Sequence, residues 1–237
     1  MISIIIFAKN EEFHLKNTYD NTITALKNLN LTDYEIILID DNSSDSTFKE
    51  MKLIATNYSK VIALQASNDK GISAAILTGF THSKGEIIVP IPGYNMYSHS
   101  AIERVLGYAS ANTLVIGCRK NLFSTRPIVK FLSSQFLLFS YRIFVSGKFC
   151  DIHGLNSYPR VIVGQAQNYK LGHGFHMIPI TLAIRSRIEI IQIGVYINKN
   201  HNKRAVRKMS KNFSTFKSIY SVISQLFEAY QILKFNK

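Results

Sequence analysis

At residues 37–47 the chain reads Ile37-Leu38-Ile39-Asp40-Asp41-Asn42-Ser43-Ser44-Asp45-Ser46-Thr47. The apolar residues at its start continue a run from Glu35 and are typical of a strand that is buried on both faces of a sheet. The carboxylates, the asparagine and the hydroxyl side chains that follow are typical of a turn and of a helix N-terminus. The segment therefore predicts a buried strand that ends in a polar loop, with a helix directly after the loop.

The same alternation continues on both sides of this segment. Short apolar runs predict strands at residues 2–7, 35–39, 61–64, 86–90 and 114–117. Between them, apolar residues recur at helical spacing within residues 15–26, 48–58, 71–80 and 102–109. This order predicts the α/β fold class, with a doubly wound, mainly parallel sheet and crossover helices. Ligands bind beyond the carboxyl ends of the strands in such sheets, so the loops at those ends form the candidate site.

The second half of the chain has a less regular pattern. Helices are predicted at residues 131–145 and 175–184, and one long strand or a strand pair at residues 187–197. Apolar residues within 216–233 recur at helical spacing and predict a C-terminal amphipathic helix. His173 and His176 are interpreted as surface or core histidines, because two histidines at this spacing are not by themselves a functional signal.

Composition and charge limit the class of protein. Of 237 residues, 46% are hydrophobic and 18% are charged, which excludes a disordered chain. The length suits one large domain, or one domain with an appendage. The formal net charge is +13, and residues 198–237 hold nine lysines and arginines but one acidic residue. This basic tail indicates either an anionic partner or a solvated basic face. The chain carries no nucleic-acid-binding motif, so nucleic acid is not expected as a partner.

The N-terminus, the hydropathy and the cysteines indicate a compartment. No basic region precedes the apolar residues 1–7, and no run reaches the roughly 18 apolar residues that span a bilayer. We therefore expect a cytoplasmic protein that is soluble or peripheral on the inner face of a membrane. Cys118 and Cys150 are too few for a disulfide scaffold and indicate a reducing compartment.

Several segments together resemble family 2 glycosyltransferases of the GT-A fold. They are residues 4–12, which end in Asn-Glu-Glu, residues 37–47, and residues 68–89 with their glycines. In the second half, residues 117–119 and 151–160 are similar to motifs of the polyprenyl-phosphate glycosyltransferases, the subgroup that includes dolichol-phosphate mannose synthase. The chain has neither G-x-G-x-x-G after its first strand nor a P-loop, so ordinary dinucleotide and P-loop sites are not expected.

The resemblance implies how the chain is divided and what it binds. The GT-A domain would cover residues 1–200, with a nucleotide-binding half at 1–120, an acceptor half at 121–200 and a basic amphipathic tail at 201–237. The donor implied by the resemblance is a nucleotide-sugar. A carboxylate after the second strand can accept hydrogen bonds from its base or ribose. The residues implied for nucleotide binding are Glu11, Asp40, Asp41, Lys70 and Gly71, with Asp41 as the principal carboxylate, whereas Asp45 is interpreted as a helix cap.

One motif departs from the family's pattern. The family carries Asp-x-Asp after its fourth strand, and these carboxylates hold Mg²⁺ or Mn²⁺ against the diphosphate. In this chain Pro92 and Tyr94 replace the two aspartates, and Met96 stands where the mannose synthases place a third ligand. We therefore expect no metal cofactor, with Mg²⁺ or Mn²⁺ present only through a relocated site such as Asp151 with His153.

Two further interpretations stay open. In a metal-independent transfer, basic side chains would stabilise the leaving phosphate, with Arg119 and Arg126 as catalytic candidates and support from bases of the tail: Lys199, His201, Lys203 and Arg204. Asp151 would face the transferred sugar or the acceptor, and would act as a base if the acceptor is a hydroxyl. Alternatively, the chain is a pseudoenzyme that binds a nucleotide or an anionic partner without turnover.

The resemblance also implies an acceptor, either a polyprenyl phosphate or a glycan. A basic tail that ends in an amphipathic helix suits an anionic membrane surface. The same helix could instead pack on the domain or join two chains in a homodimer. These alternatives are equally compatible with the pattern of residues 216–233.

Overall fold

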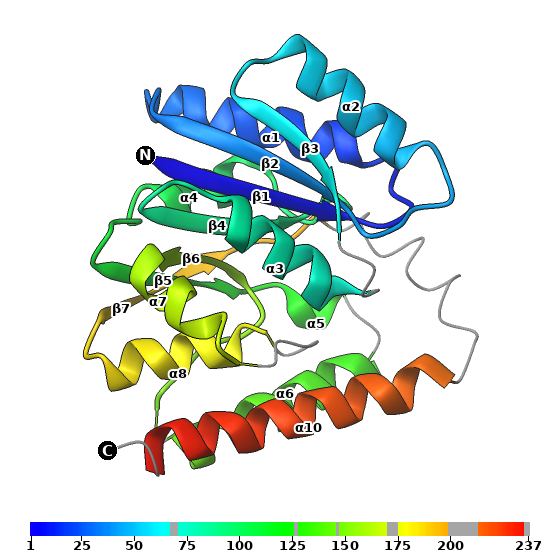
Figure 1. Cartoon of the computed structure of the whole chain (residues 1–237). Coiled ribbons are helices and arrows are strands. Elements are labelled where there is room, and N and C mark those ends of the chain that lie inside the picture. Colours follow the sequence, from blue (N-terminus) through cyan, green and yellow to red (C-terminus); the bar gives the residue numbers. More distant parts are fainter. Residues whose placement is uncertain (67–70, 126–127, 146, 170–174, 199–212, 235–237) are drawn as a thin grey trace.

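A computed structural model describes residues 1–66, 71–125, 128–145, 147–169, 175–198 and 213–234. Its centre is a seven-stranded sheet in the order β3-β2-β1-β4-β6-β5-β7 within these residues (Figure 1). The strands are β1 (Ile2–Ala8), β2 (Tyr34–Asp40), β3 (Val61–Gln65), β4 (Ile87–Pro92), β5 (Thr113–Arg119), β6 (Leu155–Pro159) and β7 (Glu189–Val195). Only β6 runs antiparallel to its neighbours β4 and β5.

The register of β1 brings three strand ends to one edge of the sheet. Phe7 near the end of β1 pairs with Ile39 of β2 on one side and with Pro92 of β4 on the other. Since these three strands are parallel, the loops that follow them start side by side. That edge is where a doubly wound sheet binds its ligand.

Helices cover both faces of the sheet (Figure 1). Alternation along β1 decides which face each residue serves, because Ile4 and Ile6 belong to one buried cluster and Ile5 to the other. The first cluster includes residues of α1 (Leu15–Asn28), α2 (Thr47–Asn57) and α4 (His99–Leu106). The second includes residues of α3 (Ile72–His82), α6 (Ile128–Val145), α7 (Arg160–Ala166), α8 (Met177–Arg185) and α10 (Phe213–Lys234).

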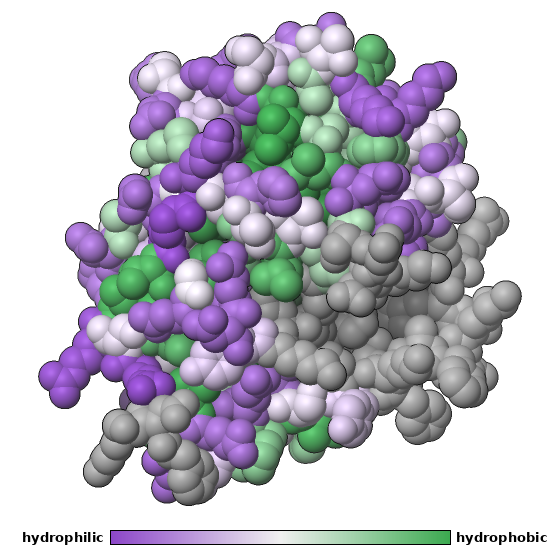
Figure 2. All heavy atoms as spheres, in the orientation of Figure 1, coloured by the Kyte–Doolittle hydropathy of each residue, from purple (hydrophilic) through white to green (hydrophobic). Residues whose placement is uncertain are grey.

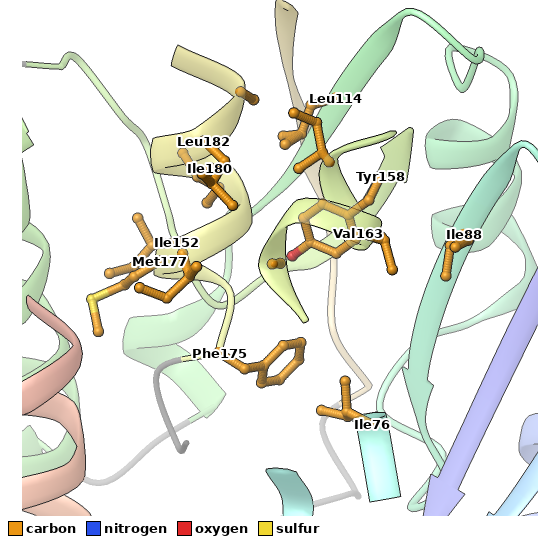
Figure 3. Packing of buried hydrophobic residues seen from close by; sticks show 14 of the residues in the cluster. Ile76, Ile88, Leu114, Ile152, Tyr158, Val163, Phe175, Met177, Ile180 and Leu182 are labelled. Carbon is orange, nitrogen blue, oxygen red and sulfur yellow. The ribbon is translucent and has the colours of Figure 1, made fainter. Parts of the chain in front are cut away.

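The core on the α3 side is packed closely. Figure 3 shows Tyr158 of β6 and Phe175 among residues of α3, α7, α8 and β4. At Gly79 of α3, a Cβ atom would lie 2.4 Å from Cγ2 of Ile5. Glycine at this position therefore lets α3 approach β1 closely, which sets the position of the helix whose first turn borders the candidate site.

α10 and α6 lie side by side on the far side of α8 from the sheet (Figure 1). α10 packs on α8 and α6, and its Ala229 and Ile232 belong to the second buried cluster. The short helix α5 (Leu122–Thr125) precedes α6. No helix within the described ranges is both long enough and apolar enough to cross a membrane.

The predicted fold class is confirmed, and each predicted strand of the first half lies within two residues of its observed bounds. Within the predicted range 187–197 the structure has one strand, β7 (Glu189–Val195), rather than a strand pair. The sequence pattern did not predict β6, which lies inside residues 151–160. Its polar residues Asn156 and Ser157 are fully buried, so the strand shows no apolar alternation.

The expectation of two reduced cysteines is wrong for this structure. Cys118 and Cys150 form a disulfide, with their Cα atoms 5.7 Å apart. This separation is ordinary for a disulfide. The physical reason lies in the tertiary fold, because the segment before β6 returns to the end of β5 after 32 residues. A spacing of that length carries no signal in the sequence.

Candidate functional site

Side-chain hydrogen bonds join the loops that follow β1 and β2. The backbone of Asn10 donates to Oγ of Ser43 at 2.9 Å, and its side-chain oxygen accepts from the backbone of Ser44 at 2.7 Å. The backbone N–H of Glu11 donates to Oγ1 of Thr47, the first residue of α2, at 2.7 Å. Asn10 has a φ of 53°, a conformation that asparagine adopts more readily than most residues. The predicted residue Glu11 is thus held at the start of α2.

The two carboxylates after β2 have different surroundings. Asp40 is fully buried and accepts hydrogen bonds from the backbone of Ser43 and the side chain of Gln65, so it stabilises the turn. Asp41 accepts from the backbone N–H of Gly71 at 2.8 Å, and its other oxygen lies 3.4 Å from Nζ of Lys9. Asp41 therefore connects the end of β2 to the first turn of α3.

Gly71 stands at a position that requires glycine. Its φ is +117°, a conformation in which side chains are strained, although a Cβ atom there would meet no neighbour within 4 Å. Gly71 precedes Ile72, the first residue of α3, and its N–H faces Asp41. Of the other predicted residues, Lys70 and Arg126 lie outside the described residues, as do His173 and the bases of residues 199–212.

Asp41 and Gly71 form a corner between β2 and α3. A pocket of about 290 Å³ opens beside this corner, at the end of β4. Its apolar and aromatic walls come from β1, α3, β4 and the following loop, residue 175 and α10: Phe7, Ile72, Pro90, Pro92, Tyr94, Met96, Tyr97, Phe175 and Val222. Its polar side is formed by Arg119, His153 and His176, with Gly154 between them. Among the described residues the pocket thus has basic and aromatic lining groups but no carboxylate.

The side chains at the end of β4 do not fit Mg²⁺ or Mn²⁺. Pro92 offers no side-chain donor atom, and the hydroxyl of Tyr94 donates to Sδ of Met96 at 3.2 Å. Both cations prefer several oxygen ligands, chiefly carboxylates and water. Within the described part of the chain, no group of three or more histidine, cysteine, aspartate or glutamate side chains is arranged to hold a metal ion.

Arg119 and Asp151 form a buried ion pair behind the pocket. Nε and Nη2 of Arg119 donate to the two carboxylate oxygens at 2.6 and 2.8 Å. Asp151 also accepts from the backbone N–H groups of Arg119, Ile152 and His153. Burial alone would raise the pKa of Asp151, but the Arg119 guanidinium and these hydrogen bonds hold it well below its usual range. Asp151 is therefore a weak base in this arrangement.

His176 belongs to a second buried network on the same side of the pocket. Oδ1 of Asn156 accepts from the backbone of Gly117, which leaves its Nδ2 to donate to the Tyr158 hydroxyl at 3.0 Å. The Tyr158 hydroxyl in turn meets Nδ1 of His176, which also lies 3.2 Å from Nδ2 of Asn156. Burial, together with nearby His153 and Arg119, places the pKa of His176 well below its ordinary value. The imidazole is therefore neutral.

This network was not predicted from the sequence. His176 was expected to be a surface or core histidine, and its side chain is indeed buried, but it also lines the pocket. Asn156 and Tyr158 alternate with Leu155 and Ser157 along β6, but nothing in their spacing relates them to a histidine 18 to 20 residues later. Their relation arises only when β6 inserts between β4 and β5.

Comparison with known proteins agrees with this arrangement of loops. The sequence model of glycosyl transferase family 2 matches residues 3–152, which is more than half of the chain. The chain belongs to glycosyl transferase family 2. The match covers the loops after β1 and β2, the end of β4 and the Arg119–Asp151 pair.

Three curated glycosyltransferases match the chain over half of its length or less. The putative glycosyltransferase CsbB of Bacillus subtilis strain 168 is 38% identical over 89 residues, 38% of this chain and 27% of that protein. The dolichol-phosphate mannosyltransferase of Pyrococcus furiosus is 27% identical over 119 residues, 50% of this chain and 33% of that protein. The undecaprenyl-phosphate 4-deoxy-4-formamido-L-arabinose transferase of Proteus mirabilis is 30% identical over 120 residues, 50% of this chain and 36% of that protein. The matched part is thus about a third of each relative.

Solved structures share the fold over almost the whole chain. Glucosyl-3-phosphoglycerate synthase of Mycobacterium tuberculosis, in complex with Mg²⁺ and uridine diphosphate, has a TM-score of 0.69 at 18% identity. The alignment covers 99% of this chain and 81% of that one. The same enzyme with Mn²⁺, uridine diphosphate and phosphoglyceric acid has a TM-score of 0.65 at 18% identity, over 95% and 78% of the two chains. The family 2 chain therefore has a GT-A glycosyltransferase fold.

Proposed function

We propose that the protein is a glycosyltransferase that moves a sugar from a nucleotide-sugar to a phosphate-bearing or glycan acceptor. The observation that carries the proposal is the corner formed by Asp41, Gly71 and the pocket beside them. Asp41 follows β2, at the edge where sheets of this kind bind ligands. It is hydrogen-bonded to Gly71, and the next residue, Ile72, lines the pocket. A nucleotide held at Asp41 and Glu11 can thus extend its diphosphate and sugar over the end of β4.

Basic groups rather than a metal would stabilise the leaving diphosphate. Arg119 is the arginine among the described residues that line the pocket. Its Nε and Nη2 donate to Asp151, whereas its Nη1 has no hydrogen-bond partner among the described residues. A guanidinium stabilises phosphate oxygens well, and a buried position strengthens the interaction. Arg126 and the bases that follow Asn198 are further candidates. Asn198, the last described residue before these bases, is hydrogen-bonded to Asn95 and Met96, and Met96 lines the pocket.

A lipid phosphate is the acceptor that the surface favours. Two of the relatives carry dolichol phosphate or undecaprenyl phosphate in their names. Figure 2 shows hydrophobic residues among polar ones along the lower edge of the molecule, where α10 lies in Figure 1. α6 packs beside α10, and the exposed side chains of these two helices include Phe136 and Phe139 of α6 and Ile223 and Phe227 of α10. Such an apolar face on a basic protein suits a peripheral position on an anionic membrane, with a homodimer as the competing use of the same face.

A binding-only protein is the second candidate, and the locked position of Asp151 favours it. Both oxygens of this carboxylate are hydrogen-bonded, and its pKa is held low, so it is poorly suited to deprotonate a hydroxyl acceptor. A phosphate acceptor needs no such base, because its oxygen is already anionic. Transfer to a lipid phosphate and binding without transfer are therefore the two outcomes to separate.

A thermal-shift panel tests the proposal. The protein would be mixed with UDP-, GDP-, CMP- and dTDP-sugars, each with Mn²⁺ and with EDTA. Stabilisation by one donor in EDTA supports metal-independent binding, and transfer of the labelled sugar to a polyprenyl phosphate then separates an enzyme from a pseudoenzyme. The Asp41→Ala variant is expected to lose the stabilisation, whereas Asp20→Ala, on the exposed side of α1, is expected to keep it. Full stabilisation of Asp41→Ala would contradict the assignment.

A further inference from the structure

The network around His176 decides which of its ring nitrogens carries the proton. The Asn156 amide is oriented by the backbone N–H of Gly117, so its nitrogen points at Tyr158 and His176. Burial raises the pKa of the Tyr158 hydroxyl, which therefore stays protonated and can donate. Nδ1 of His176 thus faces two donors and must be the acceptor. In a neutral imidazole the proton then sits on Nε2.

Nε2 of His176 has no partner among the described residues, and the ring lines the pocket. The ring is also held in place by its neighbours, with the Phe175 ring centroid 3.7 Å away and that of His153 5.9 Å away. The result is a fixed, uncharged N–H donor beside the Arg119 guanidinium. Donors held in place by packing and by other hydrogen bonds give a site its specificity.

The pocket suits one sugar ring better than a whole nucleotide-sugar. Its volume of about 290 Å³ is just below the roughly 300–1,000 Å³ of pockets that hold a drug-sized ligand. Its walls are largely aromatic and apolar, and aromatic rings such as Tyr94, Tyr97 and Phe175 can contact the apolar face of a pyranose. An uncharged donor matches a hydroxyl oxygen, while Arg119 matches a phosphate.

We propose that His176 is a sugar-binding residue that donates a hydrogen bond from Nε2 to a hydroxyl of the donor's sugar, in the tautomer set by Tyr158 and Asn156. The inference rests on the proposed function, because it takes the ligand to be a nucleotide-sugar. Beyond that function, the inference specifies that the sugar of the ligand enters the pocket and that His176 recognises it. His176 thereby determines selectivity for the sugar without contributing to the affinity for the nucleoside diphosphate.

The test compares each nucleoside diphosphate with its sugar, using UDP with UDP-glucose and GDP with GDP-mannose in calorimetric titrations. For one of these two pairs, the wild type is expected to bind the nucleotide-sugar more tightly than the nucleoside diphosphate. His176→Phe is expected to lose about tenfold in affinity for the sugar nucleotide, the worth of a hydrogen bond, with the diphosphate unaffected. His176→Gln, which keeps an N–H donor, is expected to recover part of the loss, and His99→Phe on α4 serves as the exposed control.

Nitrogen-15 spectra of the seven histidines provide a readout that needs no folded variant. His176 is expected to show the Nε2–H tautomer in the free protein, and its Nε2 signal is expected to shift with the sugar nucleotide but not with the diphosphate alone. The Nδ1–H tautomer, or an unchanged sugar increment in His176→Phe, overturns the inference and leaves the proposed function standing. Failure of the wild type to bind any of the four nucleotides of the thermal-shift panel overturns the proposed function, and the inference with it.

Discussion

At the scale of single residues, the ion pair of Arg119 and Asp151 joins the end of β5 to the segment before β6, behind the pocket. Family resemblance indicated both residues as chemically important, one for phosphate and one for the sugar or acceptor. Their pairing could not be predicted, because 32 residues separate them and the contact depends on the return of the chain to β5. The same limit hid His176, whose partners Asn156 and Tyr158 are polar residues inside a strand without alternation.

The Arg119–Asp151 pair should be important for stability. In Asp151→Asn, the buried Arg119 guanidinium loses its counter-charge, and removal of one partner of a buried pair costs about 3–5 kcal/mol. We expect a loss of this size in the free energy of unfolding at pH 7, measured by urea denaturation. Asp20→Asn, whose carboxylate forms an exposed pair with Lys16, should change the free energy of unfolding little.

The pH dependence follows from the lowered pKa of Asp151. Because the folded state holds this carboxylate ionised, its contribution is complete above the unfolded pKa of aspartate, about 3.9. It is lost as the pH falls below that value through the folded pKa. The difference in stability between wild type and Asp151→Asn should therefore narrow in acid, and equal stability at pH 7 would contradict a stabilising pair.

At the scale of secondary-structure elements, the parallel strands were predictable and β6 was not. β1, β2 and β5 are buried on both faces, so nearly every residue is apolar and the run stands out in the sequence. β6 reads Leu-Asn-Ser-Tyr-Pro, and its buried Asn156 hydrogen-bonds to the backbone of Gly117 in β5. A strand whose polar side chains are satisfied by neighbours distant in the sequence has no signal of its own.

The segment before β6 is fastened to β5 twice, by the Arg119–Asp151 pair and by the disulfide one residue earlier in each segment. A disulfide that closes a loop of about 32 residues is expected to stabilise the protein by about 3–4 kcal/mol through the unfolded chain. We therefore expect the reductant tris(2-carboxyethyl)phosphine to lower the urea midpoint of the wild type. The double variant Cys118→Ala/Cys150→Ala should have a low midpoint with or without reductant. Two reactive thiols in the unreduced, unfolded wild type would show that the bond is absent.

At the scale of the whole molecule, the apolar residues form two sets, one buried in the core and one exposed on the surface. One set of apolar residues fills the clusters on both faces of the sheet and positions the site. Another set stays on the surface of α6, where Ile128, Leu132, Phe136, Phe139 and Ile143 recur at intervals of three and four residues and are all exposed. The side chain of Phe136 is 72% exposed. Because phenylalanine is usually buried, a row of exposed apolar residues of this kind indicates a contact surface. The basic residues Arg142 and Lys234 lie exposed on the same two helices.

If this face lies on a membrane, its aromatic residues should control the partitioning. In co-sedimentation with vesicles that contain anionic lipid, Phe136→Ser/Phe139→Ser is expected to reduce binding at least tenfold, since burial of each phenylalanine is worth roughly 1.5–3 kcal/mol. Raised salt should weaken binding of the wild type, because the basic residues contribute through screened attraction. Leu53→Ser removes an exposed apolar residue from α2, on the opposite face of the sheet, and should leave binding intact. Equal loss in both variants would contradict the membrane assignment. A wild type that ignores vesicles but sediments as a dimer, and becomes a monomer in Phe136→Ser/Phe139→Ser, would assign the face to a second copy of the chain.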